Sequence, residues 1–142
     1  MSFSDYLEDA TLNYFFRNNP DSVGATATPH VGLLTAAPAE SAATAALAEV
    51  SGSNYARKSV TFSAPTTDSA NRQVVNSGAV TFDEAGGSWG TITHVALFDA
   101  STGGNWLTAS ELTDAGGTTT SKIITSGDVF KINIGDLKVK LD

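Results

Sequence analysis

The spacing of apolar residues near the start of the chain predicts an amphipathic α-helix over residues 1–19. Apolar positions recur there at intervals of three and four residues, which places them on one helical face. That face comprises Phe3, Leu7, Ala10, Thr11, Tyr14 and Phe15. Either Ser2 or Ser4 can cap the helix. We expect the helix to end at Asn18-Asn19-Pro20, because proline disfavours helical geometry in the residue before it.

From residue 29 to residue 142 the apolar positions alternate instead, which is typical of half-buried β-strands. One run, Thr91–Asp99, is apolar on both faces, as in a central strand. The expected strands are His30–Thr35, Lys58–Phe62, Ala79–Phe82, Thr91–Asp99, Trp106–Leu112, Lys122–Thr125, Val129–Ile134 and Leu137–Leu141. The alanine-rich stretch Ala36–Asn54 is predicted to be a long exposed loop, with a helical turn or two available in Ala43–Val50.

Glycine-containing turns separate these strands at the roughly 8–12 residue spacing of all-β sandwiches and barrels. The turns are Gly86-Gly87, Gly103-Gly104-Asn105, Gly116-Gly117, Gly127-Asp128 and Gly135-Asp136. We therefore predict a single, mainly β domain over residues 1–142. It combines one N-terminal helix with an antiparallel β-sandwich or barrel-like body over residues 29–142.

Composition limits the partners that this domain can have. The chain has 142 residues, a net charge of −7 and no cysteine. Its few basic residues are scattered, whereas nucleic-acid binding needs a clustered basic footprint, so no nucleic-acid partner is expected. The acidic N-terminus is unlike a signal peptide, and no apolar run is long enough to insert into a membrane. We expect a protein made in a cytoplasm.

Candidate chemistry is scarce. The chain has two histidines, His30 and His94, and both are expected to be satisfied in or beside the core rather than catalytic or metal-binding. The glycine-rich stretches lack the lysine and the spacing of a phosphate-binding loop, so they are interpreted as turns. We expect no enzymatic activity, no metal and no cofactor.

Aromatic side chains outside the predicted helix are the best candidates for ligand contact. Tyr55 and Trp106 are possible receptor contacts, because loop aromatics can stack on sugars. Trp89 lies between glycines directly before the predicted central strand. A tryptophan in that position is expected to pack into the end of the sandwich instead.

The order of these features resembles a family of small bacteriophage virion proteins known as tail-fibre proteins in siphophage-like genomes. The residues that carry the resemblance are Val31–Pro38, Glu49, Tyr55–Arg57, Val80–Phe82, Trp89–Ala100, Gly103-Gly104-Asn105 and the end of the chain from Gly135. The block Trp-Gly-Thr-Ile-Thr-His at residues 89–94 is the most specific part. The resemblance covers nearly the whole chain and implies a non-enzymatic structural protein of the virion.

Two roles in a virion remain open from sequence alone. A capsid cement (decoration) protein is the first hypothesis, because small acidic oligomers bind repeating lattices through avidity, and no fibre repeat is present. A tail-fibre or tail-tip component for host attachment is the alternative, and it predicts exposed aromatics around Trp106. Expected partners are further copies of the chain, as a trimer, and the major capsid protein or tail proteins. The expected contact residues are Phe3, Leu7, Tyr14, Phe15, Leu137, Val139 and Leu141.

Overall fold

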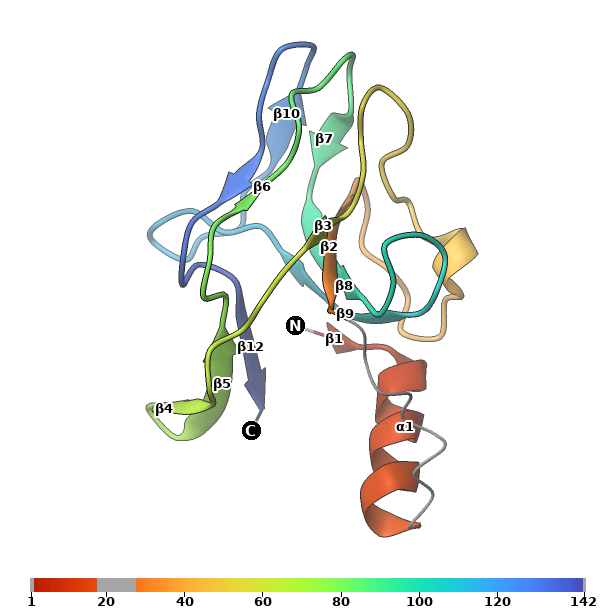
Figure 1. Cartoon of the computed structure of the whole chain (residues 1–142), viewed down its shortest axis with the longest axis vertical. Helices are drawn as coiled ribbons and strands as arrows, with labels where there is room; N and C mark the ends of the chain where they lie inside the picture. Colours follow the sequence, from red (N-terminus) through yellow and green to blue (C-terminus); the bar gives the residue numbers. More distant parts are fainter. Residues whose placement is uncertain (1, 18–27, 142) are drawn as a thin grey trace.

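The computed structural model describes residues 2–17 and 28–141, so the predicted helix end at Asn18-Asn19-Pro20 lies outside the described residues (Figure 1). One α-helix, α1, spans Asp5–Phe16 in this part of the chain. A short 3-10 helix, η2, spans Thr44–Ala46. The strands are β1 (Ser2–Phe3), β2 (His30–Leu34), β3 (Lys58–Ser59), β4 (Thr66–Asp68), β5 (Asn71–Val75), β6 (Val80–Thr81), β7 (Gly90–Ile92), β8 (His94–Phe98), β9 (Trp106–Glu111), β10 (Lys122–Ile124), β11 (Lys131–Ile132) and β12 (Lys138–Leu141).

A five-stranded antiparallel sheet in the order β1-β9-β8-β2-β3 forms the centre of the molecule. Smaller antiparallel pairs, β10-β7 and β11-β6, lie above it in Figure 1. A three-stranded sheet, β12-β5-β4, extends to one side. The prediction of a mainly β fold of antiparallel sheets with one N-terminal helix is confirmed, and the described strands do not close into a barrel.

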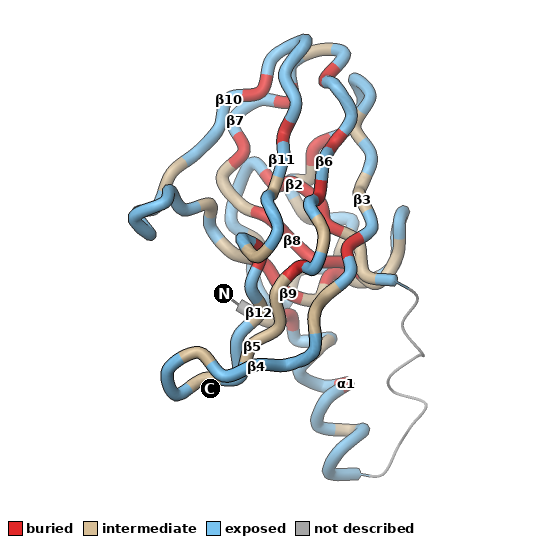
Figure 2. The backbone as a smooth tube through the Cα atoms, turned by 60° about the vertical axis from the view of Figure 1, so that its left-hand side comes forward, coloured by how far each residue is buried: buried red, intermediate tan, exposed pale blue. Residues whose placement is uncertain are grey.

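Both faces of the central sheet are buried, as Figure 2 shows along β2 and β8. The larger core cluster lies on one face, where Val31, Leu33 and Leu97 pack with Phe82 and Trp89. The smaller cluster on the other face comprises Leu34, Ala96, Phe98, Trp106 and Ala109. Adjacent residues of a strand point to opposite faces, so β2 and β8 must be apolar at nearly every position.

The predicted strand Thr91–Asp99 is interrupted. It divides at Thr93 into β7 and β8, and the backbone N–H of Thr93 donates to Leu34 O at 3.0 Å. Ile92 therefore belongs to the larger core cluster, whereas Ala96 and Phe98 belong to the smaller one. Strict alternation along Thr91–Asp99 would place Ile92 on the same face as Ala96 and Phe98, and the break at Thr93 prevents this.

The stretch Ala36–Asn54 is ordered by packing and is not simply an exposed loop. The 3-10 turn Thr44–Ala46 forms in its middle, within the predicted helical segment. Leu47 packs on the smaller core cluster, and Val50 is buried in the larger one. The prediction missed this packing because the few large apolar residues there are separated by alanines.

The base of the helix is tied into the central sheet. Phe3 lies in β1, opposite Thr108, and is not on the predicted helical face. Ser4 is the N-cap: its Oγ accepts from Leu7 N at 3.2 Å and donates to Trp106 O at 2.7 Å. The helix therefore begins at a buried anchor and then projects away from the β body (Figure 1).

Candidate functional site

The outer end of α1 exposes large apolar side chains. Leu12 is 54 % exposed, Phe15 71 % and Phe16 80 %. Only Ala10 of the helix is buried, and Leu7 is half-buried. The prediction of a single apolar face is therefore incomplete. The helix has apolar side chains that face the β body and others that point away from it.

Two of the predicted contact residues lie close together on this helix. The rings of Tyr14 and Phe15 meet edge to face, with their centroids 4.9 Å apart. Both side chains are exposed. They form a small aromatic surface that solvent reaches, which leaves them available to a partner.

The C-terminal residues that were predicted as contacts have different environments. Leu137 is buried in the larger core cluster, and Val139 packs against that cluster. Leu141 is 55 % exposed at the far end of β12. Strand β12 pairs with β5 on one side, and its other edge has no partner strand among the described residues.

A buried ion pair joins Arg57, directly before β3, to Glu49, and Arg57 also reaches the turn that follows β8. Arg57 donates from Nε and Nη2 to the two carboxylate oxygens of Glu49, each at 2.7 Å. Its Nη1 donates to Ala100 O at 3.0 Å and to Gly103 O at 2.8 Å. The guanidinium lies 3.4 Å from the centroid of the Phe98 ring. Bidentate pairing and stacking both require the planar fork of arginine.

Gly32 leaves the space that this arrangement needs. A Cβ atom at this position would lie 2.6 Å from Phe98 Cε2, 2.8 Å from Glu49 Oε1 and 3.0 Å from Tyr55 Oη. All three neighbours are fixed by packing or hydrogen bonds, so they have little freedom to move aside.

We therefore expect Gly32→Ala to lower the free energy of unfolding by about 1–3 kcal/mol, the usual cost of overpacking. Urea denaturation measures this change. The matched control is Gly78→Ala, where no atom lies within 4 Å of the added Cβ and φ is not positive. Equal stability of the two variants would contradict the steric argument.

Tyr55 is part of the same network rather than a surface aromatic. Its hydroxyl donates to Glu49 Oε1 at 2.8 Å and accepts from Leu33 N at 2.9 Å. Its ring stacks on Phe82 and meets Trp89 edge to face. The half-buried ring packs on the core, so the possible receptor contact at Tyr55 is not supported by its position.

The pKa of Tyr55 also carries a consequence for stability. Burial raises this pKa far above its ordinary value of 10.0, and the nearby Glu49 charge raises it further. The unfolded chain therefore ionises Tyr55 first as the pH rises. The contribution of neutral Tyr55 to the free energy of unfolding is therefore complete below about pH 10 and decreases as the pH rises above that value. We expect Tyr55→Phe to show a smaller loss of stability between pH 9 and about 11 than the parent chain, measured by urea denaturation at each pH.

Both tryptophans are interior. Trp89 is buried, and its Nε1 donates to Ser53 O at 3.0 Å, which confirms the prediction that it packs. Trp106 is 2 % exposed, and its Nε1 donates to Ala42 O at 2.7 Å. The expectation of an exposed aromatic at Trp106 is wrong, because β9 lies inside the central sheet and the Ala36–Asn54 stretch covers its ring.

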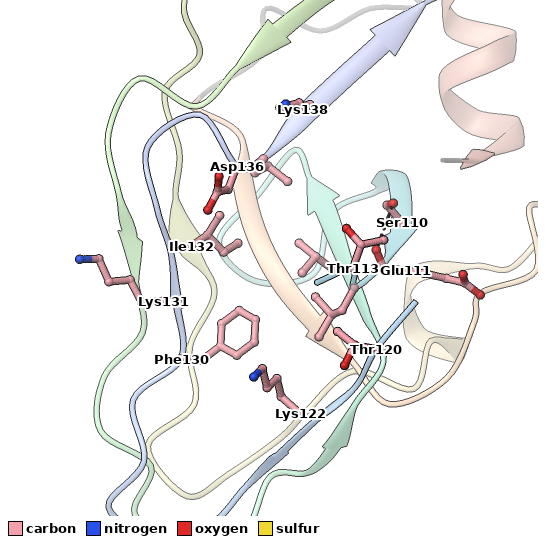
Figure 3. A pocket seen from close by; sticks show the side chains of 13 residues that line it. Ser110, Glu111, Thr113, Thr120, Lys122, Phe130, Lys131, Ile132, Asp136 and Lys138 are labelled. Carbon is pink, nitrogen blue, oxygen red and sulfur yellow. Dashed lines mark hydrogen bonds between the residues drawn. The ribbon is translucent and has the colours of Figure 1, made fainter. Parts of the chain in front are cut away.

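A cavity of about 370 Å³ opens between the end of β9 and the β10–β12 region (Figure 3). Apolar side chains, including Phe130, Ile132 and Leu137, line its floor. Lys122, Lys131 and Lys138 line it together with Glu111 and Asp136. Its volume falls within the range of roughly 300–1,000 Å³ that is typical of binding cavities.

The histidines contribute no evident site. His94 Nδ1 lies 2.8 Å from Thr93 Oγ1, beside the smaller core cluster. His30 Nδ1 is buried and has no hydrogen-bond partner among the residues that the structure describes. No group of three or more metal-ligating side chains occurs among residues 2–17 and 28–141. Within the same residues, no helix is both long and apolar enough to cross a membrane.

Comparison with known proteins adds one decisive match. A family described as Podophage GP4 fiber I protein gp80 matches residues 2–140, almost the entire chain. The chain belongs to this family. No curated protein matches it.

Membership in the podophage fiber I family confirms the resemblance to small phage fibre-type proteins. It corrects one detail, because the matching family is described from a podophage rather than from a siphophage. The family is one of phage structural proteins. Several residues that carried the resemblance, among them Gly32, Glu49 and Arg57, form the buried network described above.

Sequence reasoning missed two features of this fiber I family member. The cavity is formed by residues from five separate strands and the turns around them, so no local pattern indicated it. Leu12 and Phe16 were left out of the helical face because they lie on its opposite side. The signal that was available is the apolar bulk on both sides of the helix.

Proposed function

We propose that this chain is a non-enzymatic subunit of a podophage tail fibre, located in the virion, and that it works by oligomerisation and docking. The description of its family as a podophage fibre protein supports this role. Leu12, Phe15 and Phe16 form an exposed apolar surface that we call the outer face of α1. This surface supports a docking role, since contiguous exposed apolar groups mark interaction sites. A trimer remains the expected assembly.

Immunogold electron microscopy of intact phage tests the fibre role. Antibodies raised against the folded chain are expected to label the tail region and to leave the capsid faces unlabelled. Label distributed over the head would overturn the fibre role and favour cement. The antibody should be checked on particles from which the protein is absent, so that background binding to the head is excluded.

A further inference from the structure

The outer face of α1 lacks an occupant that the described residues can supply. Leu12, Phe15 and Phe16 are all more than half exposed. A helix with large apolar side chains all round is normally covered.

Acidic residues share this face of the helix. Helical spacing of three and four places Glu8 beside Leu12, with Phe15 on the next turn, and brings Asp5 and Asp9 alongside. The helix has no basic residue in its last turn. An occupant of this face must therefore present an apolar surface with positive charge around it.

The cavity in Figure 3 meets both requirements. Its floor is apolar, and three lysines line it against two acids, with the Lys131 side chain pointing away from the floor. Lys122, Lys131 and Lys138 form no ion pair with a described carboxylate, whereas Lys58 and Lys140 pair with Asp83 and Asp68 at 2.6 Å. In a chain of net charge −7, the lysines without such a partner are thus gathered at one apolar cavity.

We propose that the outer face of α1 from one copy of the chain docks into this cavity of a second copy. Leu12, Phe15 and Phe16 then cover the apolar floor, and the helix acids face the lysines. The helix and the cavity are different surfaces, so each copy donates one and receives one. Such head-to-tail contacts form a closed ring when the rotation between copies is a whole fraction of a turn, as the expected trimer requires. The proposal does not depend on where in the particle the assembly lies.

Cysteine cross-linking between two differently labelled chains tests the contact directly. The chain has no cysteine, so any disulfide must join introduced residues. Mixing Phe15→Cys with Ile132→Cys is expected to give a mixed dimer under oxidation, because docking brings residue 15 of one copy to residue 132 of the other. A disulfide forms only when the two Cα atoms lie within about 7 Å. The control partner is Thr67→Cys on exposed β4, which should not cross-link to Phe15→Cys. Equal cross-linking to both positions would overturn the proposal.

Charge reversal separates docking from folding. Glu8→Lys with Asp9→Lys, and separately Lys122→Glu with Lys138→Glu, should each weaken association by about tenfold in Kd, measured by sedimentation equilibrium. Combining the four changes in one chain should restore most of that affinity. A parent chain that stays monomeric at high concentration would refute the contact. So would a folded combined variant, judged by circular dichroism, that associates no better than the single pairs.

Discussion

Arg57→Ala is expected to cost the domain about 3–5 kcal/mol of its free energy of unfolding, the range for breaking a buried ion pair by removing one partner. The loss has three physical sources. The Glu49 carboxylate is left without its cationic partner in a place largely shielded from water. In the parent chain the Arg57 side chain is 6 % exposed and the Glu49 side chain 18 %. Two carbonyl oxygens, of Ala100 and Gly103, lose their donor. The Phe98 ring loses the guanidinium stacked upon it.

Urea denaturation of Arg57→Ala, Glu49→Gln and the double variant measures the coupling between the two side chains. We expect the double variant to be less destabilised than the sum of the single ones, because Glu49→Gln removes the stranded charge. Arg57→Lys is the matched control: it keeps the charge and loses the fork, so it should fall between parent and Arg57→Ala. A change below about 1 kcal/mol for Arg57→Ala would show that the pair contributes no more than a surface ion pair.

Trp106→Ala should destabilise the domain by about 3–5 kcal/mol, as truncation of a large buried aromatic generally does. The ring fills the smaller core cluster beside Phe98, and its Nε1 holds the Ala36–Asn54 stretch through Ala42 O. Thermal or urea unfolding measures the loss. Near-ultraviolet circular dichroism reports whether the remaining tryptophan keeps its packed environment.

Trp106→Phe separates the two contributions of this side chain. It preserves much of the apolar volume and leaves the Ala42 carbonyl without its donor, which costs about 1–3 kcal/mol. A receptor-contact residue would behave differently, since its truncation would reduce binding to cells and leave the unfolding transition unchanged. That second pattern for Trp106→Ala would contradict the interior role.

The fold was predictable where local patterns matched long-range packing. The predicted strands His30–Thr35, Trp106–Leu112 and Lys122–Thr125 agree with β2, β9 and β10 to within about one residue at each end. Turn glycines marked real turns: Gly103, Gly117, Gly127 and Gly135 all have positive φ, where a side chain is strained.

The hairpin of β4 and β5 could not be found this way. Its strands, Thr66–Asp68 and Asn71–Val75, are mainly polar and only partly buried, so no apolar alternation distinguishes them. Nearby Asn76 is fully buried and donates from Nδ2 to Gly78 O and Asn133 O, while its Oδ1 accepts from Leu137 N. A buried polar residue that bonds three backbone groups, two of them distant in the chain, has no signature in a single sequence.

The candidate surfaces were predictable in part. Tyr14 and Phe15 were chosen as contact residues from helical spacing, and both are exposed. The cavity was not predicted, because Val95, Phe130 and Leu137 come together only in the folded chain. Tyr55 and Trp106 were chosen because aromatics bind sugars, yet the same rings bury well, and packing prevails for both.

The pairing of β1 with β9 sets the order in which the molecule can be completed. Ser2 lies opposite Ala109, so β1 can pair only with a strand that is synthesised more than a hundred residues later. Closing so long a loop is entropically costly, and such topologies fold slowly. The helix α1 that follows β1 is therefore synthesised long before β1 can pair with β9 and fix its position. During synthesis its aromatic side chains have no finished domain to restrain them, which makes chaperone protection of the nascent chain a natural requirement for high yield.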